Sequence, residues 1–256
     1  MINVNKAFDK GKAFIAFLTA GDPNLDTTAK LLPEIANAGA DLIEIGIPFS
    51  DPVAEGVVIQ DADMRALASG TTTDKIFDMV EKVAPSCSSA LAFMTYINVI
   101  YVYGVEKFIK RCSEIGVSAV IVPDVPFEER EELTPICDKY GVNFISFIAP
   151  TSRERIQMIA KEAKGFLYCV SSLGVTGVRS QITTNVGEMI ALAKEVTDVP
   201  CAVGFGISTP QQAKKMAEVS DGVIVGSAIV KIIAEYGENC VPYVVDYVKS
   251  MKDAIR

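Results

Sequence analysis

The sequence predicts an α/β protein that folds as a single (βα)8 barrel domain over residues 1–256, and two observations carry this prediction. First, short runs of β-branched and apolar residues alternate with longer stretches of helical periodicity, which is typical of a parallel sheet with helical crossovers. Second, eight such units within 256 residues match the usual size of a barrel of this kind. A doubly wound open sheet is the alternative.

The elements are expected in a regular order along the chain. An extra helix precedes the first strand at residues 3–10, and one or two closing helices occupy residues 239–255. The strands are predicted at residues 14–19, 42–45, 91–95, 119–122, 143–147, 166–170, 200–203 and 222–225. The helices that follow them are predicted at residues 27–38, 73–84, 105–115, 128–140, 153–164, 186–196, 210–219 and 228–235.

Composition excludes several classes of protein. Half of the residues are apolar and 22% are charged, so the chain can bury a sizeable core and is neither disordered nor fibrous. The net charge is −8 and no long basic run occurs, which argues against a nucleic-acid partner. No apolar run reaches the roughly 18 residues that a membrane helix needs. We therefore expect no membrane association and a cytoplasmic location.

Two residue types limit the chemistry. The chain has no histidine, so acid–base catalysis falls to carboxylates, lysine, tyrosine or cysteine, and no metal site is expected. Its six cysteines form no CxxC pair, and we interpret them as reduced core residues.

Two long connections follow predicted strands, which is where a barrel builds its active site. The first covers residues 46–56 and is rich in proline and glycine. The second covers residues 171–185 and contains two glycines and several hydroxyl side chains. We expect the second connection to be a mobile lid.

Glu44 lies in the second predicted strand, whose side chains alternate between the two faces of the sheet. Ile43 and Ile45 would pack against the outer helices, so Glu44 would point into the barrel. The alternative is a structural glutamate paired with a barrel lysine or arginine, but neither residue type occurs inside a predicted strand. We therefore predict that Glu44 is an acid–base catalyst whose pKa is raised by burial.

Glycines in the second half of the chain predict a phosphate site. Gly177 lies in the second long connection, Gly206 follows the seventh strand, and Gly226 with Ser227 opens the helical run after the eighth. Glycine lets backbone N–H groups approach an anion, and a helix N-terminus adds positive potential. Ser227 is also plausible as a simple helix N-cap. Four more residues fit either the core or the pocket wall: Phe17, Met94, Tyr168 and Phe205.

Several short segments together resemble one family. The segment Pro-Phe-Ser-Asp-Pro-Val-Ala-Glu-Gly at residues 48–56, preceded by Glu44 and followed by Ile59-Gln60, resembles the signature of the tryptophan synthase α subunit. Segments that fit the same family follow the same order, at residues 18–23, 94–98, 122–126, 174–177 and 204–208.

The resemblance runs from about residue 8 to the C-terminus and implies a function. The family folds as a (βα)8 barrel and is a lyase of tryptophan biosynthesis. It cleaves indole-3-glycerol phosphate by a retro-aldol reaction into indole and glyceraldehyde 3-phosphate. The family works in an α2β2 complex with a β subunit that carries pyridoxal phosphate, so the resemblance implies no cofactor in this chain.

The resemblance also implies roles for single residues. Glu44 matches the catalytic acid–base, and Glu55 occupies the position of a catalytic aspartate that binds the indole N–H. Tyr168 matches a pocket tyrosine near the glycerol chain, and Thr176 matches a lid threonine that bonds to that aspartate. The phosphate-binding positions are Gly177, Gly206, Gly226 and Ser227, and the indole-pocket positions are Phe17, Met94, Tyr96 and Phe205.

Glu55 is a departure from the family pattern. It keeps the charge of the aspartate but moves the carboxylate outward by one methylene, and such shifts can cost activity. The departure motivates an alternative function, a weakly active regulatory subunit whose main role is to activate the β subunit. A sugar-phosphate isomerase is a third possibility, against which the pair of carboxylates without a histidine argues.

Overall fold

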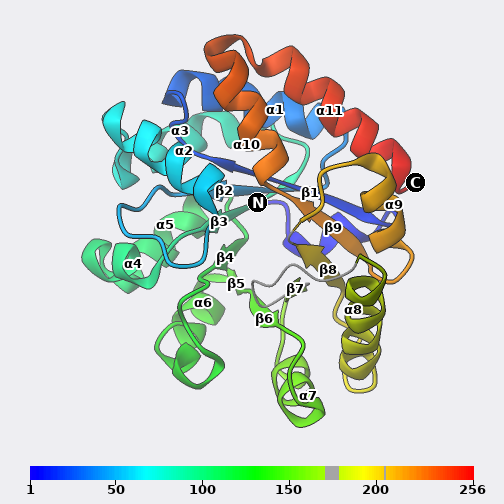
Figure 1. The fold of residues 1–256 in the computed structure, drawn as a ribbon. Helices are drawn as coiled ribbons and strands as arrows, with labels where there is room; N and C mark the ends of the chain where they lie inside the picture. Colours follow the sequence, from blue (N-terminus) through cyan, green and yellow to red (C-terminus); the bar gives the residue numbers. More distant parts are fainter. Residues whose placement is uncertain (171–178, 205) are drawn as a thin grey trace.

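The structure, a computed structural model, describes residues 1–170, 179–204 and 206–256, and for residues 179–185 it describes the backbone only. Parallel strands form a nearly closed barrel with helices around it (Figure 1). The strands occur in the order β5-β4-β3-β2-β1-β9-β8-β7-β6, so the first and last strands of the chain are hydrogen-bonded neighbours. The predicted barrel is therefore confirmed, and the open sheet is excluded.

Each predicted strand is present, and one is split in two. The strand bounds are β1 Ala13–Thr19, β2 Leu42–Gly46, β3 Ala90–Met94, β4 Ala119–Ile121, β5 Asn143–Phe144, β6 Ser146–Ile148, β7 Leu167–Val170, β8 Cys201–Gly204 and β9 Gly222–Val225. The strand predicted at 143–147 breaks at Ile145, whose N–H donates to the Val120 carbonyl at 3.0 Å. Because β5 pairs with β4 and β6 pairs with β7, this break lies at the seam of the barrel.

The helices surround the strands in chain order (Figure 1). The α-helices are α1 Leu25–Ala38, α2 Val57–Ala68, α3 Thr73–Val83, α4 Ile97–Tyr103, α5 Val105–Ile115, α6 Thr134–Tyr140, α7 Arg153–Lys161, α8 Arg179–Lys194, α9 Pro210–Ala217, α10 Ser227–Tyr236 and α11 Val241–Ala254. The 3-10 helices are η1 Val4–Phe8, η2 Ala84–Ser86, η3 Phe127–Glu132 and η4 Gly237–Asn239. The predicted N-terminal and closing helices are thus present, the former as the 3-10 turn η1.

Some predicted boundaries were wrong. The helix predicted at 128–140 is two pieces, η3 and α6, because Pro135 lies in the first turn of α6 and restarts the helix there. The connection predicted to span 171–185 ends sooner, since α8 begins at Arg179. Its other residues, 171–178, lie outside the described part of the chain. Helices α2 and α4 were not predicted.

The core has an outer layer and an inner layer. In β2, Ile43 and Ile45 belong to the outer cluster between strands and helices, whereas Leu42 belongs to the cluster inside the barrel. This is the predicted alternation along the strand. The inner cluster fills the N-terminal half of the barrel, where Val4 of η1 packs beneath it. The carboxyl ends of the strands, toward which Glu44 lies, are the opposite end, which we call the open end.

Candidate active site

Glu44 points into the barrel and is fully buried on β2. Its Cα pairs with Phe17 on β1 and with Ala92 on β3, so its nearest strand neighbours are apolar. Neither carboxyl oxygen has a hydrogen-bond partner among the described residues. Burial without a partner raises the pKa of Glu44 to about 8. At neutral pH this carboxyl group therefore holds a proton that it can donate.

Glu55 lies in the loop between β2 and α2, just before Gly56 at the start of the helix. The Tyr96 hydroxyl donates a hydrogen bond to the Glu55 carboxylate and accepts hydrogen bonds from the backbone N–H groups of Val53, at 2.9 Å, and Ala54, at 2.7 Å. Burial raises the pKa of Glu55, and the hydrogen bond from Tyr96 opposes that rise. Tyr96 therefore fixes this loop as well as the carboxylate.

Tyr168 is a buried residue of β7 and faces the barrel interior. Its ring lies 4.8 Å from the Phe147 ring, and it passes so close to Gly204 that a Cβ there would be 2.5 Å from a ring carbon. Burial, and then the charges of Glu44 and Glu55, raise the pKa of Tyr168 well above its usual range. The tyrosine thus lies within electrostatic reach of both carboxyl groups.

Phe17 and Met94 form an apolar wall at the open end. They belong to one small cluster, together with Ala62 of α2 and Val230 of α10. The Phe17 ring packs closely against Gly46 and Gly226, where a side chain would crowd it. A Cβ at Gly46 would be 2.8 Å from the ring, and one at Gly226 would be 3.1 Å from it.

The predicted phosphate positions are described only in part. Gly206 has a φ of +76°, which favours glycine, and no described atom lies where its Cβ would be. Gly226 is the N-cap of α10, and Ser227 is the first helical residue. The alternative interpretation, in which Ser227 itself is the N-cap, is therefore wrong. Thr176, Gly177 and Phe205 lie outside the described residues.

Comparison with known proteins identifies the family. The sequence profile described as tryptophan synthase alpha chain matches residues 4–256. The chain belongs to this family. Two proteins named tryptophan synthase alpha chain, from Lacticaseibacillus casei and Lactiplantibacillus plantarum, are 44% and 45% identical to it, and each match covers 100% of this chain and 96% or 97% of the relative.

Solved structures of the family superimpose on the barrel. The tryptophan synthase subunit alpha from Campylobacter jejuni is 33% identical, with a TM-score of 0.89 over 98% of this chain and 99% of that one. A chain of M. tuberculosis tryptophan synthase in an aminoacrylate-bound form is 27% identical, with a TM-score of 0.88 over 99% of both chains. The chain is accordingly a carbon–carbon lyase of tryptophan biosynthesis that cleaves indole-3-glycerol phosphate, in a family that works with a beta subunit.

One acidic residue near the alpha-chain site was missed in the sequence. Asp63, on α2, is 5% exposed and accepts hydrogen bonds from the Thr19 hydroxyl, at 3.4 Å, and from the backbone N–H of Phe49. Burial, and then the charge of Glu55, raise the pKa of Asp63 to about 7. Because α2 itself was not predicted, no periodicity was available to show that Asp63 faces inward.

Asp124, at the rim of the alpha-chain site, accepts the backbone N–H of Ile97 at 3.0 Å and so caps α4. Its charge also acts on Glu55 and raises the pKa of that carboxyl group.

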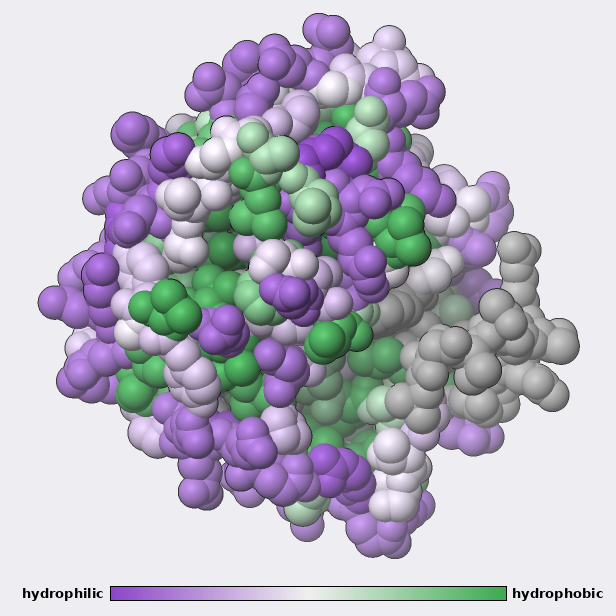
Figure 2. Space-filling view, turned by 60° about the vertical axis from the view of Figure 1, so that its left-hand side comes forward, coloured by the Kyte–Doolittle hydropathy of each residue, from purple (hydrophilic) through white to green (hydrophobic). Residues whose placement is uncertain are grey.

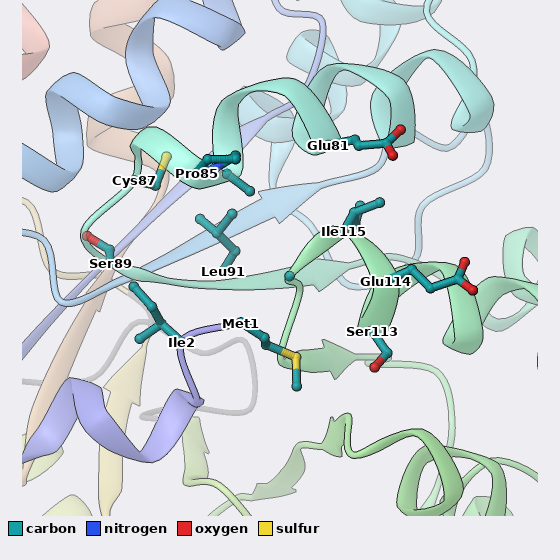
Figure 3. Close-up of a pocket in the computed structure, with 12 residues that line it drawn as sticks. Met1, Ile2, Glu81, Pro85, Cys87, Ser89, Leu91, Ser113, Glu114 and Ile115 are labelled. Atoms are coloured by element: carbon teal, nitrogen blue, oxygen red, sulfur yellow. The ribbon is translucent and has the colours of Figure 1, made fainter.

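Other features lie apart from the alpha-chain site. A cavity of about 380 Å³ lies at the opposite end of the barrel, near the start of β3 (Figure 3). Its lining residues include Met1, Ile2 and Leu91. All six cysteines are free and buried, as predicted. Over the described ranges, no helix is long and apolar enough to cross a membrane.

Proposed function

We propose that Glu44 moves the protons when this chain cleaves indole-3-glycerol phosphate. Cleavage of the bond to the glycerol chain requires a proton at C3 of the indole ring, and the glycerol hydroxyl must lose its proton as it becomes the aldehyde. A neutral Glu44 donates the first proton, and the resulting carboxylate accepts the second, so the residue returns to its starting state. The observation that carries this role is the buried carboxyl group of Glu44, which has no partner among the described residues.

The other site residues bind and orient the substrate in this proposal. Glu55 accepts the indole N–H and stabilises the positive charge that develops on the nitrogen when C3 is protonated. Tyr96 holds Glu55 in place, and Tyr168 contacts the glycerol chain. The indole pocket is lined by Phe17, Met94, Tyr96 and Phe205. The phosphate is bound by Gly177, Gly206, Gly226 and Ser227, and the Thr176 hydroxyl hydrogen-bonds to Glu55.

We also infer the assembly in which the chain works. A β subunit carries the pyridoxal phosphate in an α2β2 complex, this chain itself holds no cofactor, and the complex is cytoplasmic. Exposed apolar side chains near the open end support such a partner. Val53 and Val57 are 81% and 69% exposed in the Glu55 loop and at the start of α2, and Val102 on α4 is 82% exposed. Figure 2 turns this side toward the viewer and shows apolar surface between polar side chains.

The variant Glu44→Gln tests the role of Glu44. It keeps the shape but removes the transferable proton, so kcat for indole formation should fall by about 10²–10⁴-fold, the usual contribution of general acid–base catalysis. Binding of glycerol phosphate and the circular dichroism spectrum should be unchanged. Glu34→Gln, at an exposed position on α1, is the matched control and should retain full activity.

A Glu44→Gln chain that kept more than about a tenth of the activity would contradict proton transfer by Glu44. The same assay, run with and without a β subunit, addresses the regulatory alternative, which none of the comparisons favours. Substantial indole formation by the isolated wild-type chain would argue against a purely regulatory role.

A further inference from the structure

Asp63 is a buried acid that the mechanism above does not use. It lies in the middle of α2, and its carboxyl group faces the carboxyl ends of β1 and β2. Its hydrogen bonds come from Thr19, the last residue of β1, and from the backbone of Phe49 in the loop after β2. The α2 stripe around it is buried and narrow, with Ala62 and Ala66 as its other members.

A chain of contacts joins Asp63 to Glu55. The backbone of Phe49 donates to Asp63, the Phe49 ring lies 5.1 Å from the Tyr96 ring, and the Tyr96 hydroxyl donates to Glu55. The Glu55 charge acts on Asp63 directly and favours its protonated form. Burial and this like charge both favour the protonated form of Asp63, so Asp63 is the acid here that keeps its proton.

No described cation neutralises Asp63. Asp22, in the loop after β1, also acts on it, but Arg65 pairs with Asp22 through both carboxylate oxygens at 2.8 Å. The helix that packs on α2 is α10, whose two charged residues, Lys231 and Glu235, are exposed.

The surrounding loop adds no cation either. The loop after β2 contributes Asp51, which is exposed, and Glu55 itself, and β1 contains no charged residue. Asp63 therefore faces acids and hydrogen-bond donors, with no positive partner among the described side chains.

We propose that Asp63 is a positioning residue that keeps its proton during catalysis, so that Glu55 alone carries the negative charge offered to the indole nitrogen. The proposal rests on the role given to Glu55 above. A neutral Asp63 lets the Glu55 carboxylate stay against Tyr96. An ionised Asp63 repels that carboxylate, and Tyr96 is the one described side chain that holds it.

The proposal predicts how Asp63→Asn changes the pH profile. The amide resembles the protonated acid in shape and stays neutral, so kcat at pH 6 should remain within about threefold of wild type. In the wild-type chain kcat should fall as pH rises through about 7, where Asp63 ionises. The variant should lack this step and lose activity only at the higher pH where Glu44 loses its proton.

Two further variants make the test specific. Asp61→Asn removes the same charge from an exposed position on the same helix and should keep the wild-type profile. Thr19→Val removes the hydroxyl that favours the ionised form of Asp63, so the step should move to higher pH. A merely structural role for Asp63 predicts no such movement.

A titration that is independent of cleavage completes the experiment. The full chain is labelled with ¹³C at the aspartate carboxyl carbons and followed by NMR. The Asp63 signal is assigned as the one that is absent from the spectrum of Asp63→Asn. It should titrate near pH 7, and at lower pH in Glu55→Gln. An Asp63 signal that titrates near 3.8, the ordinary value for aspartate, or identical pH profiles for wild type and Asp63→Asn would overturn the proposal.

Absence of indole formation by the wild-type chain at every pH would instead count against the function proposed above, because the titration is read without substrate.

Discussion

Single carboxyl groups in this barrel acquire different properties because their surroundings differ. Glu44 is buried among apolar neighbours with no hydrogen-bond partner in the described structure, whereas Glu55 is half-buried and bound by Tyr96. Burial favours the neutral form and a hydrogen-bond donor favours the charged form. The two glutamates at this end of the barrel therefore differ in the balance between burial, which acts on both, and hydrogen bonding, which acts on Glu55 alone among the described residues.

The buried Glu44 should make stability depend on pH. Its pKa is about 8 in the folded chain and 4.5 ordinarily, so between these values the unfolded chain gives up a proton that the folded chain keeps. The free energy of unfolding should therefore fall as pH rises through this window. Each pKa unit is worth about 1.4 kcal/mol, which gives a total of a few kcal/mol.

Urea unfolding of wild type and Glu44→Gln at several pH values measures this effect. The contribution of Asp63 is common to both chains and cancels in the difference between them. The stability of the wild type relative to the variant should decrease from pH 5 to pH 8 and then level off. A difference that stays constant with pH would show that Glu44 ionises normally in the folded chain.

The sequence predicts the inward orientation of Glu44 but not that of Asp63. Glu44 could be placed because it lies in a short strand, where a period of two assigns each side chain to a face. Asp63 could not, because the stripe that α2 buries is narrow and made of small residues, so the helix has a weak apolar pattern. An inward-facing acid in the middle of such a helix weakens that pattern further.

Among the elements, α2 is joined to the barrel by a charged pair as well as by apolar packing of Ala62 against Phe17 and Val230. Asp22 has a side chain that is 1% exposed, and Arg65 on α2 is 38% exposed and bonds to both of its oxygens. This pair connects the loop after β1 to the helix that follows the Glu55 loop. Removing the arginine leaves the aspartate buried without its partner, which is costlier than losing an exposed pair.

Arg65→Met should therefore destabilise the chain by about 2 kcal/mol in urea unfolding at pH 7. The double variant with Asp22→Asn should recover part of the loss, because it removes the buried charge as well. Arg153→Met, which breaks the exposed pair with Glu195, is the control and should cost less than about 1 kcal/mol. Equal losses in the two single variants would mean that the Asp22 pair gives α2 no special support.

The unpredicted α4 shows why some elements escape sequence analysis. Its residues, Ile-Asn-Val-Ile-Tyr-Val-Tyr, are largely β-branched or aromatic and favour a strand by propensity. The helix is instead capped by Asp124, which is 27 positions away in the sequence. Strands β1, β2 and β9 lie within a residue or two of their predicted bounds because the apolar runs that define them are local.

At the scale of the whole molecule, the open end of the barrel carries both the Glu44 and Glu55 carboxyl groups and the most exposed apolar side chains of the described residues. Glu55 lies between Val53 and Val57, and Tyr96, which holds Glu55, is the N-cap of the helix that exposes Val102. A partner that covers these valines would therefore touch the elements that position the Glu55 carboxylate. We infer that such contact would give a β subunit a physical route to influence cleavage.

Val102→Asp tests this placement of the partner without altering a residue of the site. A charge at the centre of an apolar contact is poorly tolerated, so affinity for a β subunit, measured by titration calorimetry, should fall about tenfold or more. Cleavage of indole-3-glycerol phosphate by the isolated chain should be unchanged, since Val102 is 82% exposed and is not one of the proposed site residues. Met158→Asp, on α7, changes another exposed apolar residue and should leave affinity intact. If Met158→Asp weakened the complex and Val102→Asp did not, the β subunit would bind a different face, and its influence on Glu55 would need another route.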